Sequence, residues 1–508
     1  MFIKEQCHGK SARQRVRQSR YLSKNVYMEN PKIIQGGMGI AVSSWSLARA
    51  VSLCGQLGVI SGTALDVVFC RRLQLGDPGG QMRLAVDHFP MPEMAERVWN
   101  RYFVDGGKQD DQPFKSKPNF SNKDIQALLE LTILANFCEV FLAKLGHAGQ
   151  VGINLLEKIQ LPTVPSLFGA MLAGVDYVLM GAGIPRNIPG YLDKLAELEQ
   201  VELKFDVHGA LAGEENRVKF APKKFTAEGV TSLKRPKFLA IVSSSTLALS
   251  LSKKSSGKVD GFIVEGKTAG GHNAPPRGGL RIDERGEPIY GPRDEADLSE
   301  FRAIGLPFWL AGSYADPCKL EEAIAEGAEG IQVGTAFAFC EESGMDAQYK
   351  HQIIEKCLGD DVSVFTDALA SPTGFPFKVV LLEDSLSAAA VYEERERICD
   401  LGYLRQAYRE EDGKVGFRCP AEPVEDYLRK GGALEDTVGR KCVCNGLMAT
   451  IGLGQIRKDG TTEAPIITAG DDVRNIAKFV PPGKNSYHAA DVIHYLLRAA
   501  PVHAGVTG

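Results

Sequence analysis

A histidine that follows two glycines is the feature of this sequence that most directly suggests chemistry. His272 lies in a stretch, residues 259–279, that opens with an apolar run ending at Glu265 and continues through Gly270 and Gly271. Such a run is typical of a buried strand, and glycine lets a loop backbone come close to a ligand. Because imidazole exchanges protons near neutral pH, we predict that His272 is a catalytic acid or base. The competing interpretation, which fits most single histidines beside glycine, is an ordinary loop residue.

Two glycine-containing segments later in the chain could bind a phosphate. Gly312 and Ser313 follow one apolar run, and Gly334 and Thr335 follow the next. Backbone N–H groups beside helix N-termini bind anions, and barrel enzymes often use the loops after their last two strands in this way. The alternative is that these glycines only form tight turns. The sequence has no GxGxxG after its first strand and no GxxxxGK[ST], so the mononucleotide FMN suits this site better than a dinucleotide or a P-loop nucleotide.

The elements that must position these residues alternate between strand and helix. From Ile33 onward, eight short apolar runs are each followed by a helical pattern. Repeated strand-helix order implies a parallel sheet, and eight pairs are the number of the closed barrel. The predicted fold is therefore α/β, a (β/α)8 TIM barrel, with a doubly wound open sheet as the alternative. The predicted strand segments are KIIQGGMG, LGVISGT, VGINLL, VDYVLMGAG, KFLAIVSSS, VDGFIVEG, PFWLAGS and EGIQVGTAF.

The predicted barrel, residues 31–345, carries two insertions and is flanked by two further segments. An insertion after the second strand, residues 66–150, has a polar stretch followed by a long helical pattern, and we predict that it forms a helical cap over the barrel mouth. A second insertion, residues 201–236, is predicted to be a surface excursion. Residues 1–30 are expected to form a basic N-terminal arm, and residues 346–508 a C-terminal helical extension.

Composition favours a small-molecule substrate. The chain of 508 residues has 63 acidic and 59 basic residues, a net charge of -4, so we expect no nucleic-acid partner. Its 11 cysteines form no dense disulfide framework, which is typical of a reducing compartment and predicts the cytoplasm. Cys419, Cys442 and Cys444 lack the spacing of a zinc site, so no metal is predicted and they are expected to be buried thiols.

The most apolar stretch, residues 164–183, contains Gly169, Gly174 and Asp176. These residues divide it into a helix and a strand more naturally than they fit one membrane span, so no membrane span is predicted. The sequence leaves open whether the chain forms a homo-oligomer.

Several of these segments, taken together and in order, resemble the nitronate monooxygenase (2-nitropropane dioxygenase-like) superfamily of FMN-dependent TIM barrels. That superfamily also includes the flavin-type enoyl-ACP reductases. The segments are IIQGGMG, VGINLL, VEGKTAGGHN, LAGS and IQVGTAF, and the resemblance covers residues 31–340, with a family-like tail motif, SPTGFPFK, at residues 371–378.

The resemblance implies a role for each matching position. His272 matches the catalytic histidine of the family's AGGH motif, and Asn154 matches an asparagine that contacts FMN. The chain departs from the family after His272, where AGGHxG continues as Asn273-Ala274-Pro275-Pro276, and at Ser313, where a second glycine is common. The cap insertion and the long tail also exceed the compact enzymes, and these departures concern the substrate more than the cofactor. The other cofactor positions implied are Gly37 and Met38 under the flavin ring, Ser243 on the fifth strand, Gly270 and Gly271 beside the flavin, and Gly312, Ser313, Gly334 and Thr335 at the phosphate.

These implications predict an FMN-dependent oxidoreductase in which His272 transfers a proton beside the flavin. Nitronate monooxygenase-like oxidation of nitronates or nitroalkanes with O2 is the first expectation. The alternatives are an enoyl-thioester (enoyl-ACP) reductase with NAD(P)H as co-substrate, and a flavin-binding accessory protein that docks partners.

Overall fold

Eight short strands that are almost wholly buried form the centre of the structure. In this computed structural model, which describes residues 30–123 and 125–498, they pair in parallel and close into a barrel in the order β1-β11-β10-β8-β7-β4-β3-β2. Strands covered on both faces read as continuous apolar runs, which is why the sequence shows no alternating pattern. The predicted TIM barrel is confirmed, and each strand falls in its predicted segment: β1 (Ile33–Gln35), β2 (Leu57–Ser61), β3 (Val151–Leu156), β4 (Tyr177–Gly181), β7 (Lys237–Val242), β8 (Gly261–Glu265), β10 (Phe308–Ala311) and β11 (Gly330–Val333).

Large side chains fill the interior of the barrel. Trp309, Tyr177 and Ile263 belong to one cluster of buried residues contributed by six of the strands. The indole Nε1 of Trp309 donates to the carbonyl of Pro31 at 2.7 Å, so its polar atom is satisfied within the core. The barrel is thus a packed scaffold, and ligands are confined to its ends.

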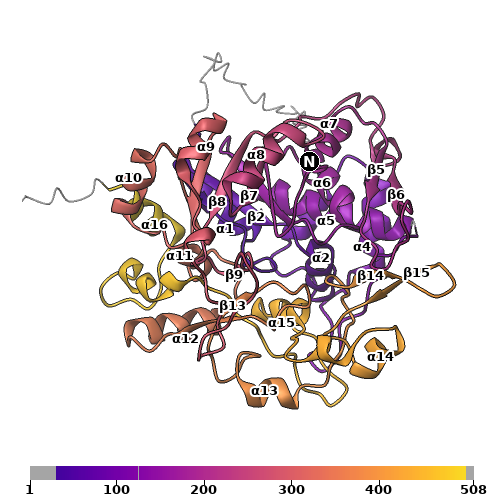
Figure 1. Cartoon of the computed structure of the whole chain (residues 1–508). Helices are drawn as coiled ribbons and strands as arrows, with labels where there is room; N and C mark the ends of the chain where they lie inside the picture. The colour runs from indigo at the N-terminus through magenta and orange to yellow at the C-terminus, as the bar shows by residue number, and fades with distance from the viewer. Residues whose placement is uncertain (1–29, 124, 499–508) are drawn as a thin grey trace, which may run out of the picture. The chain divides into compact units, whose positions relative to one another are not determined.

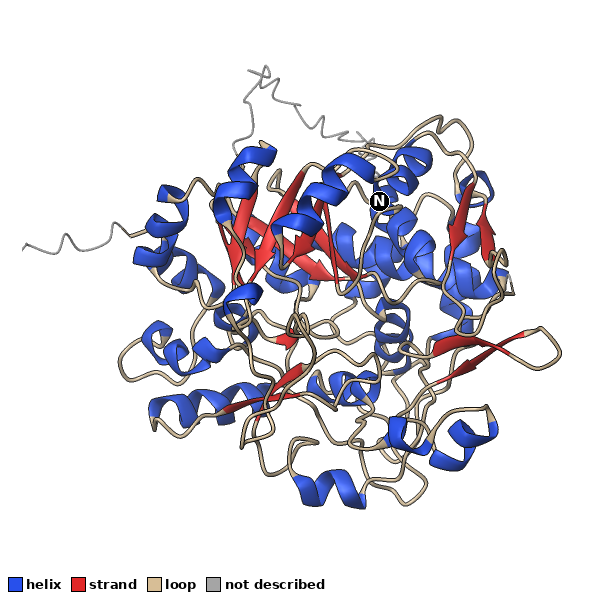
Figure 2. Ribbon diagram, viewed as in Figure 1, coloured by secondary structure: helices blue, strands red, loops and turns tan. Residues whose placement is uncertain are grey.

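Helices surround the strands, as the blue ribbons around the red barrel in Figure 2 show. They bury one face against the barrel and, in several cases, a second face against each other. The helices up to the last barrel strand are α1 (Trp45–Leu53), α2 (Leu65–Gln74), α3 (Gln81–Val86), α4 (Pro92–Tyr102), α5 (Gln126–Lys144), α6 (Thr163–Leu172), α7 (Ile188–Ala196), α8 (Ser245–Lys254), α9 (Leu298–Ile304) and α10 (Pro317–Ala325), with short 3-10 turns η1 (Pro222–Phe225) and η2 (Pro292–Asp294).

Helix α5 is long and apolar enough, by length and composition alone, to cross a membrane. Its apolar window is 78% buried, because it packs against α6, α1 and α2 in the helical layer. A core helix buried on nearly every face has the same composition. The stretch at residues 164–183 divides into α6 and β4, as predicted.

The two insertions form separate features. Residues 66–150 contain most of α2 together with α3, α4 and α5, and residues 201–236 contain a two-stranded antiparallel ribbon, β5 (Val201–Lys204) and β6 (Arg217–Phe220). The predicted basic arm, residues 1–30, lies outside the described residues apart from Asn30.

In Figure 1 most orange and yellow elements of the chain after β11 lie on one side of the barrel strands, whereas the last helix, residues 489–496, lies beside α10. Two of its strands join the histidine loop: β12, β13 and the two-residue β9 (Gly271–His272) form a small antiparallel sheet. The elements of this part are α11 (Thr335–Ala338), α12 (Ala347–Leu358), β12 (Val364–Asp367), β13 (Phe377–Val380), α13 (Ala389–Glu394), β14 (Gln406–Arg409), β15 (Val415–Arg418), α14 (Val424–Arg429), η3 (Leu434–Thr437), α15 (Val443–Thr450), η4 (Asp471–Phe479) and α16 (Ala489–Leu496).

Candidate active site

A pocket lies at the carboxyl ends of the barrel strands, and the residues that end those strands form its floor. This is the end at which barrel enzymes bind ligands. The structure brings together ten of the eleven site residues predicted from the sequence: Gly37, Met38, Asn154, Gly270, Gly271, His272, Gly312, Ser313, Gly334 and Thr335.

Ser243 is the exception. It lines a separate small cavity, where its carbonyl accepts a hydrogen bond from Arg277 Nη2 at 2.7 Å. The strand before it, β7, does reach the pocket, but through Ile241. The structure thus places Ser243 outside this pocket, and its predicted contact with the cofactor stays a prediction.

Several buried polar atoms in the pocket wall have no partner among the described residues. They are Asn154 Oδ1, Ser313 Oγ and Gln332 Oε1. Buried polar groups are nearly always hydrogen-bonded, so three such atoms around one pocket indicate that the wall is built for a polar ligand.

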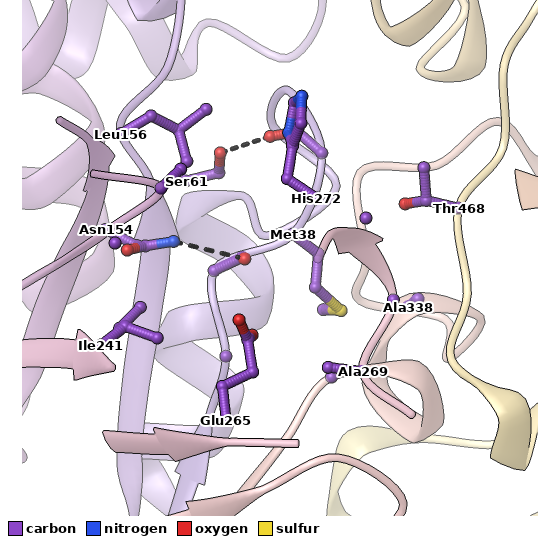
Figure 3. A pocket seen from close by; sticks show the side chains of 18 of the residues that line it. Met38, Ser61, Asn154, Leu156, Ile241, Glu265, Ala269, His272, Ala338 and Thr468 are labelled. Atoms are coloured by element: carbon purple, nitrogen blue, oxygen red, sulfur yellow. Dashed lines mark hydrogen bonds between the residues drawn. The ribbon is translucent and has the colours of Figure 1, made fainter. Parts of the chain in front are cut away.

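The loop after β1 is held close to β3. The Asn154 amide nitrogen lies 3.5 Å from the carbonyl of Gly37, and a Cβ at position 37 would lie 2.4 Å from Asn154 Cβ. Ser43 fixes the same loop, because its Oγ donates to the carbonyl of Gly36 at 2.9 Å and accepts from the amide of Met38 at 3.0 Å. Figure 3 shows Asn154 facing this loop across the pocket.

His272 is fixed by the C-terminal part of the chain. It pairs with Phe377 in the β9-β13 ladder, and its Nε2 lies 2.7 Å from Ser371 Oγ. The ring also packs edge-on against Phe377, with centroids 4.7 Å apart. Burial, and then the nearby charge of Lys158, lowers the pKa of His272 to about 4. The imidazole is therefore neutral at physiological pH and able to accept a proton.

Glu265, the last residue of β8, is a second protonatable group in the pocket. Figure 3 shows its carboxyl group pointing toward Met38 and the loop after β1. It makes no hydrogen bond or ion pair with any described residue, and burial raises its pKa to about 7. The sequence shows this glutamate at the end of a strand, but its protonation state depends on burial and could not be predicted.

The loops after β10 and β11 form the predicted phosphate side of the pocket. Gly312 and Ser313 both adopt left-handed backbone, with φ of 101° and 56°, which is unusual for a serine. Thr335 Oγ1 accepts from the amide of Gly470 at 2.9 Å. Asp472 is also close, and burial raises its pKa, which reduces the negative charge that would oppose an anion here.

The cover of the pocket differs from the prediction. No residue of the insertion 66–150 lines the pocket; the C-terminal extension does, through Tyr403, Leu404, Cys444, Leu447 and Ala469. The expected helical cap is wrong because the insertion's apolar helices are buried in the barrel's outer layer. The motif at residues 371–378 was the one sequence signal that pointed to this part of the chain.

The insertion at residues 66–150 still supports one wall of the pocket, through contacts with Tyr403. Its Asp66 accepts a hydrogen bond from the hydroxyl of Tyr403 and pairs with Lys117 Nζ at 3.0 Å, and all three side chains are buried. The ring of Tyr403 is thereby held at the pocket wall.

Three cysteines of the C-terminal extension were predicted to be buried thiols. Cys419, Cys442 and Cys444 are free thiols, the first two buried. Among the residues that the structure describes, no group of three or more His, Cys, Asp or Glu side chains could hold a metal ion.

Comparison with known proteins agrees with the motifs. The family model for nitronate monooxygenase matches residues 195–372, which include Glu265, His272, both phosphate-side loops and Ser371. A probable nitronate monooxygenase of Bacillus subtilis is 30% identical over 132 residues, which are 25% of this chain and 35% of that protein.

Two further proteins are similar. A hydroxy-methyl-oxo-octahydroindene-carboxyl-CoA dehydrogenase of Rhodococcus jostii is 28% identical over 128 residues, 25% of this chain and 31% of that protein. FabK from Thermotoga maritima, a solved structure, aligns with 92% of each chain at 17% identity and a TM-score of 0.45. The matches to both curated relatives thus span about a third of their length. The chain is therefore similar to nitronate monooxygenases over residues 195–372, the part that the family model matches.

Proposed function

We propose that this protein is an FMN-dependent oxidoreductase that oxidises nitronates or nitroalkanes with O2. The observation that carries the proposal is one pocket that joins a neutral imidazole, His272, to glycine-lined loops with unpartnered polar atoms. The family match and the names of the curated relatives support the same reaction class.

The pocket residues fit FMN. Asn154 Oδ1 and Gln332 Oε1 offer polar contacts for a flavin ring, and the loops with Gly312, Ser313 and Gly334 suit a phosphate. FMN, when bound, would supply a ring that takes up and passes on electrons.

His272 acts on the proton. Its unprotonated nitrogen can accept a proton from the carbon beside a nitro group, and Ser371, 2.7 Å from Nε2, holds the ring in one orientation. Glu265, half-protonated near pH 7, can donate a hydrogen bond to an anionic substrate. The side chains of Tyr403, Leu404 and Leu447 exclude water above these groups.

The experiment is a comparison of redox partners on FMN-loaded protein. O2 uptake with a nitronate, in the absence of pyridine nucleotide, is expected. Oxidation of NAD(P)H that requires an enoyl thioester would replace this proposal with the second candidate. A protein that binds FMN but oxidises or reduces neither class would be an accessory flavoprotein.

Reduction of an enoyl thioester with NAD(P)H is the second candidate. It is favoured by a second, larger cavity beside the pocket, which a small nitronate does not need, and by a relative that is named for a CoA thioester. His272, whose imidazole is neutral at physiological pH, would then have to take up a proton before it could protonate the carbon next to the thioester carbonyl.

A further inference from the structure

A second cavity adjoins the pocket and is the larger of the two, about 690 Å³ against about 190 Å³. The two cavities share Ile159, Tyr403 and Leu404 as wall residues, so they are neighbours across these side chains. The other walls come from the excursion after β4, the turn before β13 and the β14-β15 ribbon. His272 lines the smaller cavity, on the other side of these shared side chains.

Arg418, at the end of β15, is the unusual residue of this cavity. It is only 7% exposed, and its guanidinium lies over the rings of Tyr408 and Tyr427, 4.8 and 5.5 Å from their centroids. Nη1 donates to the carbonyl of Lys430 at 2.9 Å, and Nη2 lies 3.4 Å from His208 Nδ1.

This buried cation has no anionic partner. Arg418 makes no ion pair with any described carboxylate, and its Nε is enclosed without a hydrogen-bond acceptor. A buried charge without a counter-charge is costly, and the Nε-Nη2 edge is the edge with which arginine binds a phosphate or carboxylate in two parallel hydrogen bonds. The site is therefore electrostatically incomplete without an anion.

Three more cations line the same cavity, and they too lack carboxylate partners among the described residues. Lys158 donates to the carbonyl of Thr373 at 3.1 Å, Arg405 to that of Phe120 at 2.8 Å, and Arg440 to that of Ser371 at 2.7 Å. Carbonyl bonds orient a cation without neutralising its charge. Burial lowers the pKa of Lys158 to about 8, so this ammonium group would also gain from an anion.

The acidic groups of the cavity do not cancel this charge. Gln160 donates to Glu157 at 3.3 Å and to Asp206 at 3.0 Å, and Tyr427 donates to Asp436 at 3.2 Å. Burial raises the pKa of Glu157, which weakens its negative charge. Four cations thus face three carboxyl groups, one of them hard to ionise.

We propose that this cavity binds the phosphate groups of a phosphorylated acyl thioester, with Arg418 pairing to phosphate while the acyl group extends past Tyr403 to His272. The proposal rests on the second candidate function, since a nitronate has no such group. Coenzyme A and a carrier-bound pantetheine share this chemistry, and NADPH also carries phosphates.

Binding of coenzyme A to the purified full chain, measured by titration calorimetry, tests the proposal. Wild-type protein is expected to bind it, and inorganic phosphate at high concentration should compete. Arg418→Gln should weaken binding about tenfold or more, because it removes a charge-assisted, two-point contact. The control is Arg409→Gln on the same ribbon, since Arg409 pairs with Glu214 at 3.3 Å and does not line the cavity.

Absence of coenzyme A binding to wild-type protein would overturn the proposal, as would full affinity in a cooperatively melting Arg418→Gln variant. If Arg418→Gln weakens the binding of NADPH but not that of coenzyme A, the cavity is a nucleotide site and the proposal is overturned. If Arg418→Gln does not fold, Arg405→Gln is the second variant, and unchanged affinity there contradicts the proposal. Because binding is measured without turnover, these results are independent of whether either redox reaction occurs.

Discussion

His272 is kept neutral by burial rather than by a charged partner. Its Nε2 contacts the Ser371 hydroxyl, and Lys158 further disfavours protonation. A group with a pKa of about 4 is a base at every pH above that value, so turnover that uses it should fall only as the pH drops through about 4.

Replacement of this histidine separates proton transfer from binding. His272→Asn should slow turnover of a protonated nitroalkane by roughly 10²- to 10⁴-fold, the usual contribution of a general base. A preformed nitronate has already lost the proton, so the penalty on that substrate should be much smaller. Steady-state rates of His272→Asn on the nitroalkane and on the nitronate measure the two penalties. Equal losses would mean that His272 binds the substrate. Wild-type rates on both substrates would mean that His272 neither transfers the proton nor binds the substrate.

Glu265 should make kcat/KM for a nitronate depend on pH near neutrality. With a pKa of about 7, its carboxyl group loses its proton as the pH rises, and the resulting charge repels an anionic nitronate. We expect kcat/KM for a nitronate to fall above about pH 7 in wild-type protein. Glu265→Gln should abolish this fall, while Glu295→Gln, an exposed control, should retain it; a fall that persists in Glu265→Gln would assign it to another group.

The raised pKa of Glu265 also predicts how the stability of the folded protein changes with pH. Its pKa is raised in the folded state, so the folded protein binds more protons than the unfolded chain between about pH 4.5 and 7. Its stabilising contribution is present below this range and is lost as the pH rises through it. Denaturant titrations at pH 5 and 8 should therefore show a larger stability loss on going to pH 8 in wild-type protein than in Glu265→Gln.

At the scale of elements, the histidine loop is joined to the C-terminal extension along its length. The β9-β13 pair holds Gly271 and His272, and the amide of Asp471 donates to the carbonyl of Thr268 at 3.0 Å. Lys378 adds a bond to the carbonyl of Lys267 at 3.1 Å and an ion pair to Asp471 at 2.5 Å. The loop after β8 therefore takes its shape from residues about a hundred or more positions later in the chain.

A methyl group on Gly270 should push the histidine loop away from the C-terminal extension. A Cβ on Gly270 would lie 2.6 Å from the backbone carbon of Ala469, a distance that neither backbone can tolerate. Gly270→Ala should reduce flavin content and turnover with little loss of secondary structure. Gly291→Ala is the matched control, because its Cβ would meet nothing within 4 Å and its φ is not left-handed. Wild-type flavin content and rate in Gly270→Ala would show that this contact is unimportant.

At the scale of the whole molecule, the barrel and the C-terminal extension share one hydrophobic core. Tyr487, Val492 and Ile493 belong to the same buried cluster as barrel residues such as Ile331. We therefore expect a chain truncated after residue 345 to expose apolar surface and to lose cooperative unfolding. Calorimetry measures this; a truncated chain with a sharp, reversible transition would show that the extension is an independent domain.

The sequence was sufficient to predict the barrel and ten of the pocket residues, because strand-end glycines and His272 lie within local motifs. It was insufficient where the determinant is distant in sequence. The contact of Ser371 with His272, the cover formed by Tyr403 and the missing counter-charge of Arg418 each depend on tertiary packing. The cap prediction was wrong because an apolar helical pattern indicates burial but does not tell against which surface the helix packs.

The flavin content of the protein tests the central claim most directly. Wild-type protein, incubated with FMN and desalted, should retain about one flavin per chain, and its visible absorption should bleach anaerobically with the substrate. Gly334→Val should retain little flavin, because the valine side chain would occupy the space of the FMN phosphate. The fold should tolerate this valine, since a Cβ at position 334 would lie 3.4 Å from the flexible Met38 side chain and the backbone φ is -108°. No bound flavin in folded wild-type protein, or equal flavin in folded Gly334→Val, would contradict the account.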